Sequence, residues 1–192
     1  MKRVILATSS QHRIKAFSTL GLKFETWSSE VDEYFPGRPD KPEYLVMHLS
    51  RLKAESVPEK CNDNAIVFGF DSVAFFNGEI LEKPKSKEEA VLRLQKLSGK
   101  SFTFYTGMRV IRIGANTRSS KVVATTAFMR KISDAEIYFY LEQDPHFFTY
   151  ALGFDALHTY GATFIREIRG SYNNILRGIP LEEVMEIINF ME

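Results

Sequence analysis

One carboxylate stands in a stretch of sequence where a charge is out of place. Asp71 lies within residues 67–73, an apolar run with the sequence VFGFDSV, and a carboxylate in such a run must be paired, bound to a metal or catalytic. Glu33, Lys53 and Lys83 could complete a site of mixed charge, although each alone is more often a surface charge. A magnesium–triphosphate complex needs this mixture, because carboxylate oxygens hold the metal while cations neutralise the phosphates.

A second group of candidate residues follows the first apolar run of the chain. Ser10, Gln11, His12 and Arg13 come shortly after residues 2–7, where a strand would end and a helix begin. The first backbone N–H groups of a helix attract phosphate, and Arg13 could add a two-pronged hydrogen bond. On this segment alone, a plain helix cap with a solvated arginine is the simpler interpretation, since such openings are common.

Three familiar nucleotide and metal motifs are absent from the sequence. Gly99-Lys100-Ser101 resembles the end of a phosphate-binding loop, but Leu94 stands where that loop needs its first glycine. No G-x-G-x-x-G fingerprint occurs, and none of the four histidines belongs to an H-E-x-x-H pattern. These absences argue against a Walker-type site, a dinucleotide fold and zinc hydrolysis.

The elements that must position these residues alternate between strand and helix patterns. Ser86 and Ser133 each begin a capping-box pattern, and Asn77-Gly78 separates two apolar runs in the manner of a hairpin turn. Apolar periodicity predicts strands over residues 2–7, 22–27, 65–76, 102–113, 121–131 and 162–168. It predicts five helices: one that ends at Gly21, one over residues 43–57, one that ends at Gly99, one that follows Ser133 and one that begins at Pro180. A loop is expected over residues 144–160.

This alternation predicts a mixed α/β fold, with a long twisted sheet and flanking helices. The β-rich stretches on either side of residues 114–117 predict a long antiparallel pair within that sheet. With 192 residues and neither a linker nor an internal repeat, the chain is expected to form one domain over residues 1–192.

Composition limits the partners and the compartment. The 25 basic residues nearly balance the 24 acidic ones, so the overall charge does not favour a nucleic-acid polymer and any anionic ligand must be held locally. No apolar stretch approaches the roughly 20 residues that span a bilayer, and the N-terminus lacks a secretory leader pattern. The single Cys61 has no partner for an internal disulfide. We therefore expect a cytoplasmic protein that binds neither membranes nor nucleic-acid polymers.

The candidate residues fall within short motifs that resemble the Maf family of nucleotide pyrophosphatases. Each motif is short, but their order and spacing over nearly the whole chain are specific. In sequence order they are VILATSSQHR at residues 4–13, VDE at 31–33, RLKA at 51–54, GFDS at 69–72, EILEKP at 79–84, LSGK at 97–100, YTG at 105–107, GSYNN at 170–174 and GIPL at 178–181.

This resemblance implies a house-cleaning hydrolase that cleaves a nucleoside triphosphate to the monophosphate and pyrophosphate, with Mg²⁺ or Mn²⁺ as cofactor. It implies an elongated α/β fold similar to that of inosine triphosphate pyrophosphatases, with the nucleotide in a cleft between two lobes, and it is compatible with a homodimer. By motif position it implies phosphate contacts for Ser10 and Arg13, metal and water contacts for Glu33 and Asp71, polyphosphate contacts for Lys53 and Lys83, and a general-base role for Asp71.

The first loop departs from the family pattern. The family usually has Ser-Pro-Arg-Arg there, and in this chain Gln11 and His12 replace the proline and the first arginine. One potential phosphate fork is thereby lost, so Arg13 must carry more of that work.

A larger departure lies in residues 151–161. The family commonly ends this glycine-rich stretch in Ile-Gln-Gly or Ile-Glu-Gly, whereas this chain has no glutamine or glutamate at the matching place. Asp155 or His158 could substitute, or His158 could be an ordinary loop histidine. We expect this loop to form part of the pocket rim and to influence which nucleobase is bound.

The altered loop also motivates a competing interpretation. The protein could retain the fold and bind a nucleotide or a protein partner, with weakened catalysis and a regulatory role related to cell division. Tight nucleotide binding without turnover would support this alternative, whereas turnover that depends on Asp71 would exclude it.

Overall fold

The computed structural model describes residues 3–29, 31–57, 64–115 and 117–191; the expected start of the first strand at residue 2 and Cys61 lie outside these ranges. The elements, in chain order, are β1 (Arg3–Ala7), α1 (Gln11–Ser18), β2 (Glu25–Trp27), α2 (Pro42–Glu55), β3 (Ala65–Phe76), β4 (Glu79–Leu81), α3 (Lys87–Leu97), β5 (Ser101–Arg112), β6 (Thr117–Met129), α4 (Asp134–Gln143), the short 3₁₀ helices η2 (Phe147–Thr149) and η3 (Tyr160–Thr163), β7 (Ile165–Arg169), α5 (Tyr172–Arg177) and α6 (Leu181–Met191).

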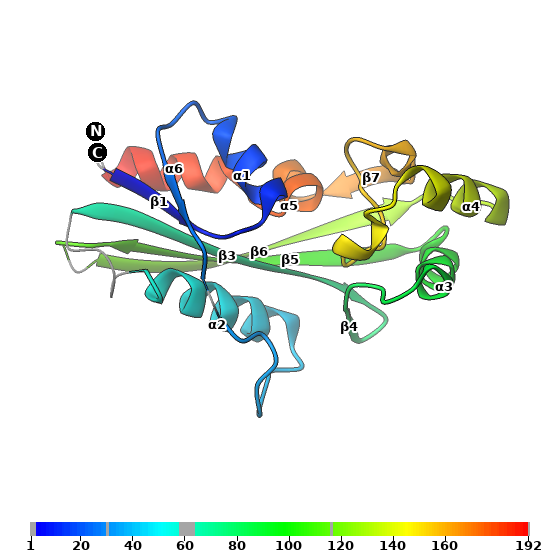
Figure 1. The fold of residues 1–192 in the computed structure, drawn as a ribbon, viewed down its shortest axis with the longest axis horizontal. Coiled ribbons are helices and arrows are strands. Elements are labelled where there is room, and N and C mark those ends of the chain that lie inside the picture. The colour runs from blue at the N-terminus through cyan, green and yellow to red at the C-terminus, as the bar shows by residue number, and fades with distance from the viewer. Residues whose placement is uncertain (1–2, 30, 58–63, 116, 192) are drawn as a thin grey trace.

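A seven-stranded sheet runs the length of the molecule in the order β2-β1-β3-β5-β6-β7, with β4 paired to β3 (Figure 1). β1 is parallel to β2 and β3, whereas β3 is antiparallel to β4 and β5. The expected long pair is formed by β5 and β6, from Ser101 opposite Phe128 to Arg112 opposite Thr117. The predicted mixed α/β fold with a long twisted sheet is confirmed.

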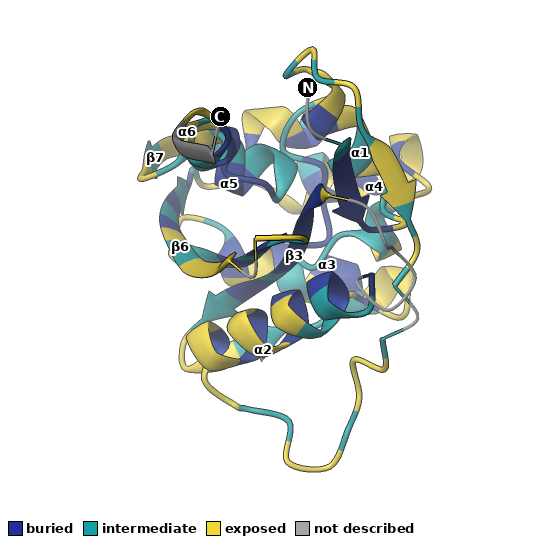
Figure 2. Cartoon of the chain, turned by 90° about the vertical axis from the view of Figure 1, so that its left-hand side faces the viewer, coloured by how far each residue is buried: buried dark blue, intermediate teal, exposed yellow. Residues whose placement is uncertain are grey.

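Helices cover both faces of one half of the sheet. α1, α5 and α6 lie on one face, and α2 lies on the other (Figure 1). Alternation along β3 produces both layers: Phe68 and Phe70 join the core beneath α1 and α6, while Ala65 and Val67 join the core beneath α2. On α2 itself, the side facing the sheet is buried and the outer side is exposed (Figure 2).

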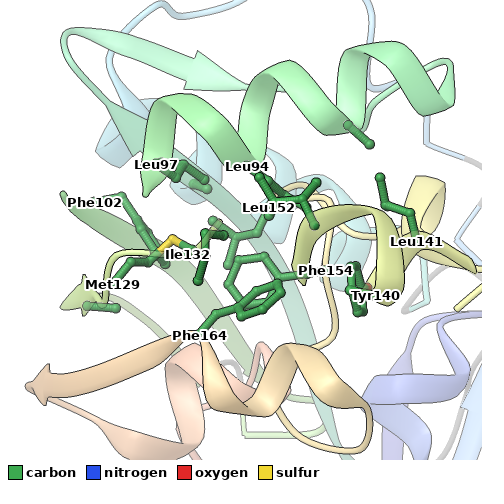
Figure 3. Packing of buried hydrophobic residues seen from close by; sticks show 14 of the residues in the cluster. Leu94, Leu97, Phe102, Met129, Ile132, Tyr140, Leu141, Leu152, Phe154 and Phe164 are labelled. Carbon is green, nitrogen blue, oxygen red and sulfur yellow. The ribbon is translucent and has the colours of Figure 1, made fainter. Parts of the chain in front are cut away.

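A further hydrophobic core fills the other half of the molecule, where α3 and α4 pack against the sheet (Figure 3). Tyr140, Phe154 and Phe164 are buried there and form edge-on or tilted ring pairs. Leu94 and Leu97 of α3 face these rings across the core. This core and the two cores beneath α1 and α6 and beneath α2 occupy different halves of the molecule, in keeping with the two lobes that the family resemblance implies.

Local sequence signals placed several element ends correctly. Asn77 and Gly78, both with positive φ, form the turn of the β3–β4 hairpin. The capping box at Ser133 and Glu136 is complete. At Ser86 only half of the box forms: the Ser86 hydroxyl accepts the Glu89 N–H, but the Glu89 carboxylate accepts the Lys85 N–H instead of the Ser86 N–H.

Several expected element bounds were wrong. The second strand of the long pair, β6, spans Thr117–Met129 instead of residues 121–131, so it begins within the expected turn over residues 114–117. β2 covers only Glu25–Trp27, because it pairs with just three residues of β1. The final strand begins at Ile165 instead of residue 162, because η3 occupies the preceding residues. The loop over 144–160 includes η2.

Among the described helices, none combines the length and apolarity that a membrane span requires.

Two glycines let α2 approach the sheet closely. A Cβ atom at Gly69 would lie 2.5 Å from the Ser50 carbonyl oxygen, and one at Gly107 would lie 2.1 Å from the Val46 carbonyl oxygen. Both contacts are with helix backbone, which cannot rotate away as a side chain can. The absence of side chains at these positions brings α2 against β3 and β5.

Gly107→Ala is therefore expected to lower the free energy of unfolding by about 2–3 kcal/mol, because the added methyl group must push α2 away from the sheet. Urea unfolding of the two proteins, compared at equal m-value, measures the loss. An unchanged urea midpoint would contradict the close approach of helix and strand.

Candidate active site

The candidate site lies at a notch in the sheet beside β3. On one edge, β3 pairs with β1 through residues 65–69 and with β4 through residues 74–76. Residues 70–73 have no described strand on that edge, although β5 pairs with them on the other edge. Asp71 lies in this gap, between the loop that follows β1 and the segment that follows β4. The notch is thus a crevice at the end of a parallel strand, a common position for ligand sites in α/β sheets.

A cavity of about 560 Å³ occupies the notch, a volume typical of small-ligand sites. Segments far apart in the sequence line it, from the start of α1 to the end of α5. The structure brings to this cavity every residue singled out from the sequence: Ser10, Arg13, Glu33, Lys53, Asp71, Lys83, Asp155 and His158.

A shared lysine organises one side of the cavity. Lys53 Nζ lies 2.6 Å from Asp71 Oδ1 and 2.6 Å from Glu33 Oε1. Asp71 is only 5% exposed, and this burial raises the pKa of its carboxyl group above the ordinary value, because the nearby Lys53 and Arg13 do not fully offset the desolvation. The carboxylate in the apolar run is therefore buried and paired, and it is more basic than an exposed aspartate.

Glu33 belongs to the segment between β2 and α2, which extends away from the sheet (Figure 2). Partial burial raises the pKa of Glu33, but the neighbouring cations, Lys53 foremost, outweigh this effect and lower the pKa below its ordinary value. With its pKa lowered, Glu33 remains a carboxylate over most of the pH range. An ion pair of 2.8 Å between Arg38 and Glu82 ties the same segment to the residues after β4.

Arg13 reaches the open edge of β3 from α1. Its Nη1 donates to the Phe70 carbonyl oxygen and its Nη2 donates to Ser72 Oγ, each at 2.9 Å. Burial lowers the pKa of Arg13, while Asp71 raises it, and a guanidinium keeps its charge under such shifts. Arg13 therefore hydrogen-bonds to residues of β3 that have no described neighbouring strand on this edge. The guanidinium that the sequence suggested for phosphate binding is thus also bonded to β3.

The start of α1 presents polar groups to the cavity. Ser10 is the N-cap residue, yet its side chain makes no capping hydrogen bond. The first turn of α1 contains no acidic residue, so the backbone N–H groups and the positive end of the helix are not neutralised by a carboxylate of that turn. This arrangement favours an anionic group of a ligand.

His12 packs against an aromatic ring from the other lobe. The ring centroids of His12 and Tyr150 are 5.2 Å apart, and both residues line the cavity. Burial, with Asp144 and Asp155 nearby, raises the pKa of Tyr150 to about 12, so its phenol stays neutral. The histidine that replaces the family arginine thus contacts the second lobe across the cavity.

The late loop lines the cavity, and its two candidate residues differ in environment. Asp155 is buried, and its carboxylate accepts the Leu157 N–H at 2.8 Å and lies 3.2 Å from His158 Nδ1. Its own N–H donates to the buried Tyr140 hydroxyl. The His158 side chain, in contrast, is 48% exposed. Asp155 therefore holds the loop in shape, while His158 lies where it can meet a ligand.

Sequence reasoning missed α5, which closes the cavity from another side. The Ser171 hydroxyl caps this six-residue helix, and Gly178 ends it in the left-handed conformation. Asn174 is fully buried, and its Nδ2 donates to Thr125 Oγ1 and to the backbone of β5 and β6. The serine–glycine spacing within residues 170–178 was a usable signal for the helix.

Ser72 connects the notch in β3 to the neighbouring strand β5 and to the end of α5. Ser72 Oγ lies 2.8 Å from Thr106 Oγ1 and 3.3 Å from the Gly178 carbonyl oxygen. Arg177, the last residue of α5, also lines the cavity. None of these residues received a role from the sequence.

Comparison with known proteins places the chain among proteins of similar length. Residues 3–191 match a family model described as Maf-like protein. A dTTP/UTP pyrophosphatase of Thermoanaerobacter sp. (strain X514) is 32% identical over 186 residues, which cover 97% of this chain and 95% of that protein. A dTTP/UTP pyrophosphatase of Syntrophus aciditrophicus (strain SB) is 36% identical over 190 residues, covering 99% and 90% respectively.

Another relative carries a different substrate name. A 7-methyl-GTP pyrophosphatase of Nitrosococcus oceani is 31% identical over 185 residues, covering 96% of this chain and 91% of that protein. Among solved structures, a HAM1 protein from Coxiella burnetii shares the fold with a TM-score of 0.52 and 12% identity, over 98% of this chain and 99% of that chain. The family match and these relatives extend over nearly the whole sequence, and the chain therefore belongs to the Maf-like protein family.

Proposed function

We propose that the protein is a nucleoside triphosphate pyrophosphatase, which hydrolyses the bond between the α- and β-phosphates and releases the monophosphate and pyrophosphate. The observation that carries this proposal is the cavity in which Arg13, Lys53 and Lys83 accompany the carboxylates Glu33 and Asp71. Relatives named as dTTP/UTP and 7-methyl-GTP pyrophosphatases support the same class of reaction for this chain.

The cationic residues bind and orient the phosphate chain in this proposal. Ser10 and Arg13, at the start of α1, meet phosphate oxygens with N–H and O–H donors. Lys53 and Lys83 lie on the carboxylate side of the cavity, and the Coulomb attraction of Lys83 helps to lower the pKa of Glu33. Fixed cations of this kind stabilise the negative charge that develops on the phosphates during bond cleavage.

The donor set fits a hard divalent cation that is held jointly with the substrate. Glu33 and Asp71 offer carboxylate oxygens, which Mg²⁺ and Mn²⁺ prefer. Within the described part of the chain, no group of three His, Cys, Asp or Glu residues could hold a metal ion. Mg²⁺ commonly binds through one or two protein carboxylates together with substrate phosphates, and this is the arrangement proposed for Glu33 and Asp71. When bound, the ion would neutralise phosphate charge and activate the attacking water.

Asp71 is the proposed general base, and its pKa gives a direction for the pH dependence. The carboxyl group accepts a proton from water only when it is ionised, and burial raises its pKa above that of an exposed aspartate. We therefore expect kcat to rise with pH through that raised pKa, at pH values above those at which an exposed aspartate ionises. Measurement of kcat at saturating substrate across this range tests the assignment. A kcat that is already maximal near pH 4 would exclude Asp71 as the base.

The proposal is tested by pyrophosphate release from a panel of nucleoside triphosphates in the presence of Mg²⁺. The panel includes the canonical ribo- and deoxynucleotides and 7-methyl-GTP, and a parallel series contains excess chelator. We expect release of equal amounts of monophosphate and pyrophosphate that stops with the chelator. Tight binding without turnover of any nucleotide would overturn the proposal in favour of a binding protein, and full turnover in chelator would overturn the role of the metal.

Substitutions at His158 and Asp155 in the late loop are expected to have different effects when tested on the same nucleotide panel. His158→Ala is expected to change the ratio of kcat/KM between nucleotides by about 3- to 10-fold, with a shift in Tm below about 2 °C, because the side chain is half-exposed at the cavity. Asp155→Ala removes a buried carboxylate that caps the loop, so it should lower Tm as well. Unaltered kinetics for every nucleotide in His158→Ala would restrict the loop to a structural role.

A further inference from the structure

Arg177 is a cation of the cavity without a protein counter-charge in the described ranges. It lines the cavity. Its Nε is buried and has no hydrogen-bond partner, and within residues 3–29, 31–57, 64–115 and 117–191 its guanidinium forms neither a hydrogen bond nor an ion pair. Arg13 and Lys53, by comparison, are both bonded to protein groups. An unpaired guanidinium at a ligand-sized cavity is a donor that the fold itself does not use.

The backbone directly after Arg177 lies beside Arg13, and both arginines line the same cavity. The neighbouring Gly178 lies so close to the first loop that a Cβ atom there would be 3.9 Å from Arg13 Nε and 3.6 Å from Ser72 Oγ. α5 packs on the same face of the sheet as α1, and α2, which carries Lys53, lies on the opposite face (Figure 1). Cations therefore enter the notch from both faces of the sheet.

The backbone that carries Arg177 is firmly held. Asn174, one turn earlier, is fully buried and donates at 3.0 Å to Thr125 Oγ1 and at 3.1 Å to the Val123 carbonyl oxygen. Gly178 ends the helix directly after Arg177. A side chain on such an anchored helix end loses little backbone freedom when it binds a ligand.

We propose that Arg177 binds the phosphate chain of the nucleotide together with Arg13. This inference rests on the proposed function and extends it to a residue outside the motif set. A guanidinium offers five N–H donors in a planar fork that matches phosphate oxygens, and a phosphate chain in the cavity is long enough to meet more than one cation of its lining. His12 occupies the place of an arginine in the first loop, so Arg177 supplies a second guanidinium to the cavity from α5.

Binding of inorganic tripolyphosphate in the presence of Mg²⁺ tests the proposal, because this ligand has the phosphate chain but neither sugar nor base. Isothermal titration calorimetry compares the wild-type protein with Arg177→Gln and with Arg166→Gln. Arg166 is an exposed arginine of β7 outside the cavity, so its variant controls for the loss of one positive charge. We expect affinity to fall about tenfold or more in Arg177→Gln and to stay within about twofold of wild type in Arg166→Gln.

Thermal unfolding without ligand separates binding from a structural role. The Arg177 guanidinium has no described partner, so Arg177→Gln should leave Tm near that of the wild type. A fall in Tm that parallels the loss of affinity would overturn the proposal, as would equal losses in both variants. No binding of tripolyphosphate to the wild-type protein would also overturn it. So would a change in KM for nucleotides with unchanged tripolyphosphate affinity, which would assign Arg177 to the sugar or base.

These measurements keep the two proposals distinguishable. If the wild-type protein binds tripolyphosphate and Arg177→Gln does so more weakly, the binding role is supported whether or not turnover is observed. Absence of turnover with every nucleotide would then overturn the proposed pyrophosphatase activity alone.

Discussion

Asp71→Asn is expected to lower kcat by about 10³-fold, because an amide can neither accept a proton from water nor offer a charged oxygen to a metal. The fold should persist, since Lys53 keeps Glu33 as a partner at 2.6 Å when the Asp71 charge is removed. Pyrophosphate release at saturating nucleotide and Mg²⁺ measures kcat, and circular dichroism with thermal unfolding measures the fold. Substitution also removes a desolvated carboxylate, so Tm should stay near that of the wild type.

Asp134→Asn is the matched control for this substitution. Asp134 is an exposed residue at the start of α4, where it accepts a hydrogen bond from Gln95, and it does not line the cavity. Its kcat should stay within about twofold of wild type. An Asp71→Asn protein that kept more than about a tenth of wild-type kcat would rule out Asp71 as the general base.

Lys53→Met is expected to lower the free energy of unfolding by about 3–5 kcal/mol at neutral pH, and to abolish measurable turnover. Methionine keeps much of the apolar stem, so the loss reports on the charge. Without Lys53, the buried Asp71 loses its described ion-pair partner, and an uncompensated buried charge is strongly unfavourable. Urea unfolding measures the change. In the double variant Lys53→Met/Asp71→Asn both charges are absent, so most of the lost stability should return.

The pH dependence of this loss has a defined sign. The pKa of Asp71 is raised in the folded protein, so the folded state binds this proton more tightly than the unfolded chain does. Stability from this group is therefore fully present below the unfolded pKa and is lost as pH rises through the folded pKa. Removal of Lys53 raises that pKa further, so the deficit of Lys53→Met should shrink as the solution is acidified. A deficit that is constant with pH, or that persists in the double variant, would contradict the buried-charge explanation.

Much of the fold was predictable because local chemistry determines it. The capping box at Ser133 and the turn at Asn77-Gly78 act within a few residues, and both occur as expected. Asp71 was recognisable for a related reason: an ionisable side chain in an apolar strand must be compensated, and the structure pairs it with Lys53. The assignment of catalytic roles within the cavity depended on family resemblance, and it stays a prediction.

Other features depend on relations between distant segments. The notch exists because β1 and β4 pair with different parts of the same edge of β3 and leave residues 70–73 between them, a register that no local pattern encodes. The six-residue α5 is too short for a clear apolar period, and its role follows from the contacts of Asn174 with β5 and β6. Arg177 gives no local signal in the sequence, because whether an arginine has a counter-charge depends on its neighbours in the folded protein.

The unbroken pairing of β3 with β5 has a mechanical consequence. These strands stay in register from Ile66 opposite Arg112 to Phe75 opposite Thr103, with Asp71 opposite Gly107 in between. A continuous ribbon has no single soft joint, so the lobes can turn relative to each other chiefly through a small change in sheet twist. Displacement in such a rotation grows with distance from the axis, and the loops at the rim travel furthest. Such a change in twist would therefore displace Asp71, near the middle of the ribbon, less than the loops at the cavity entrance.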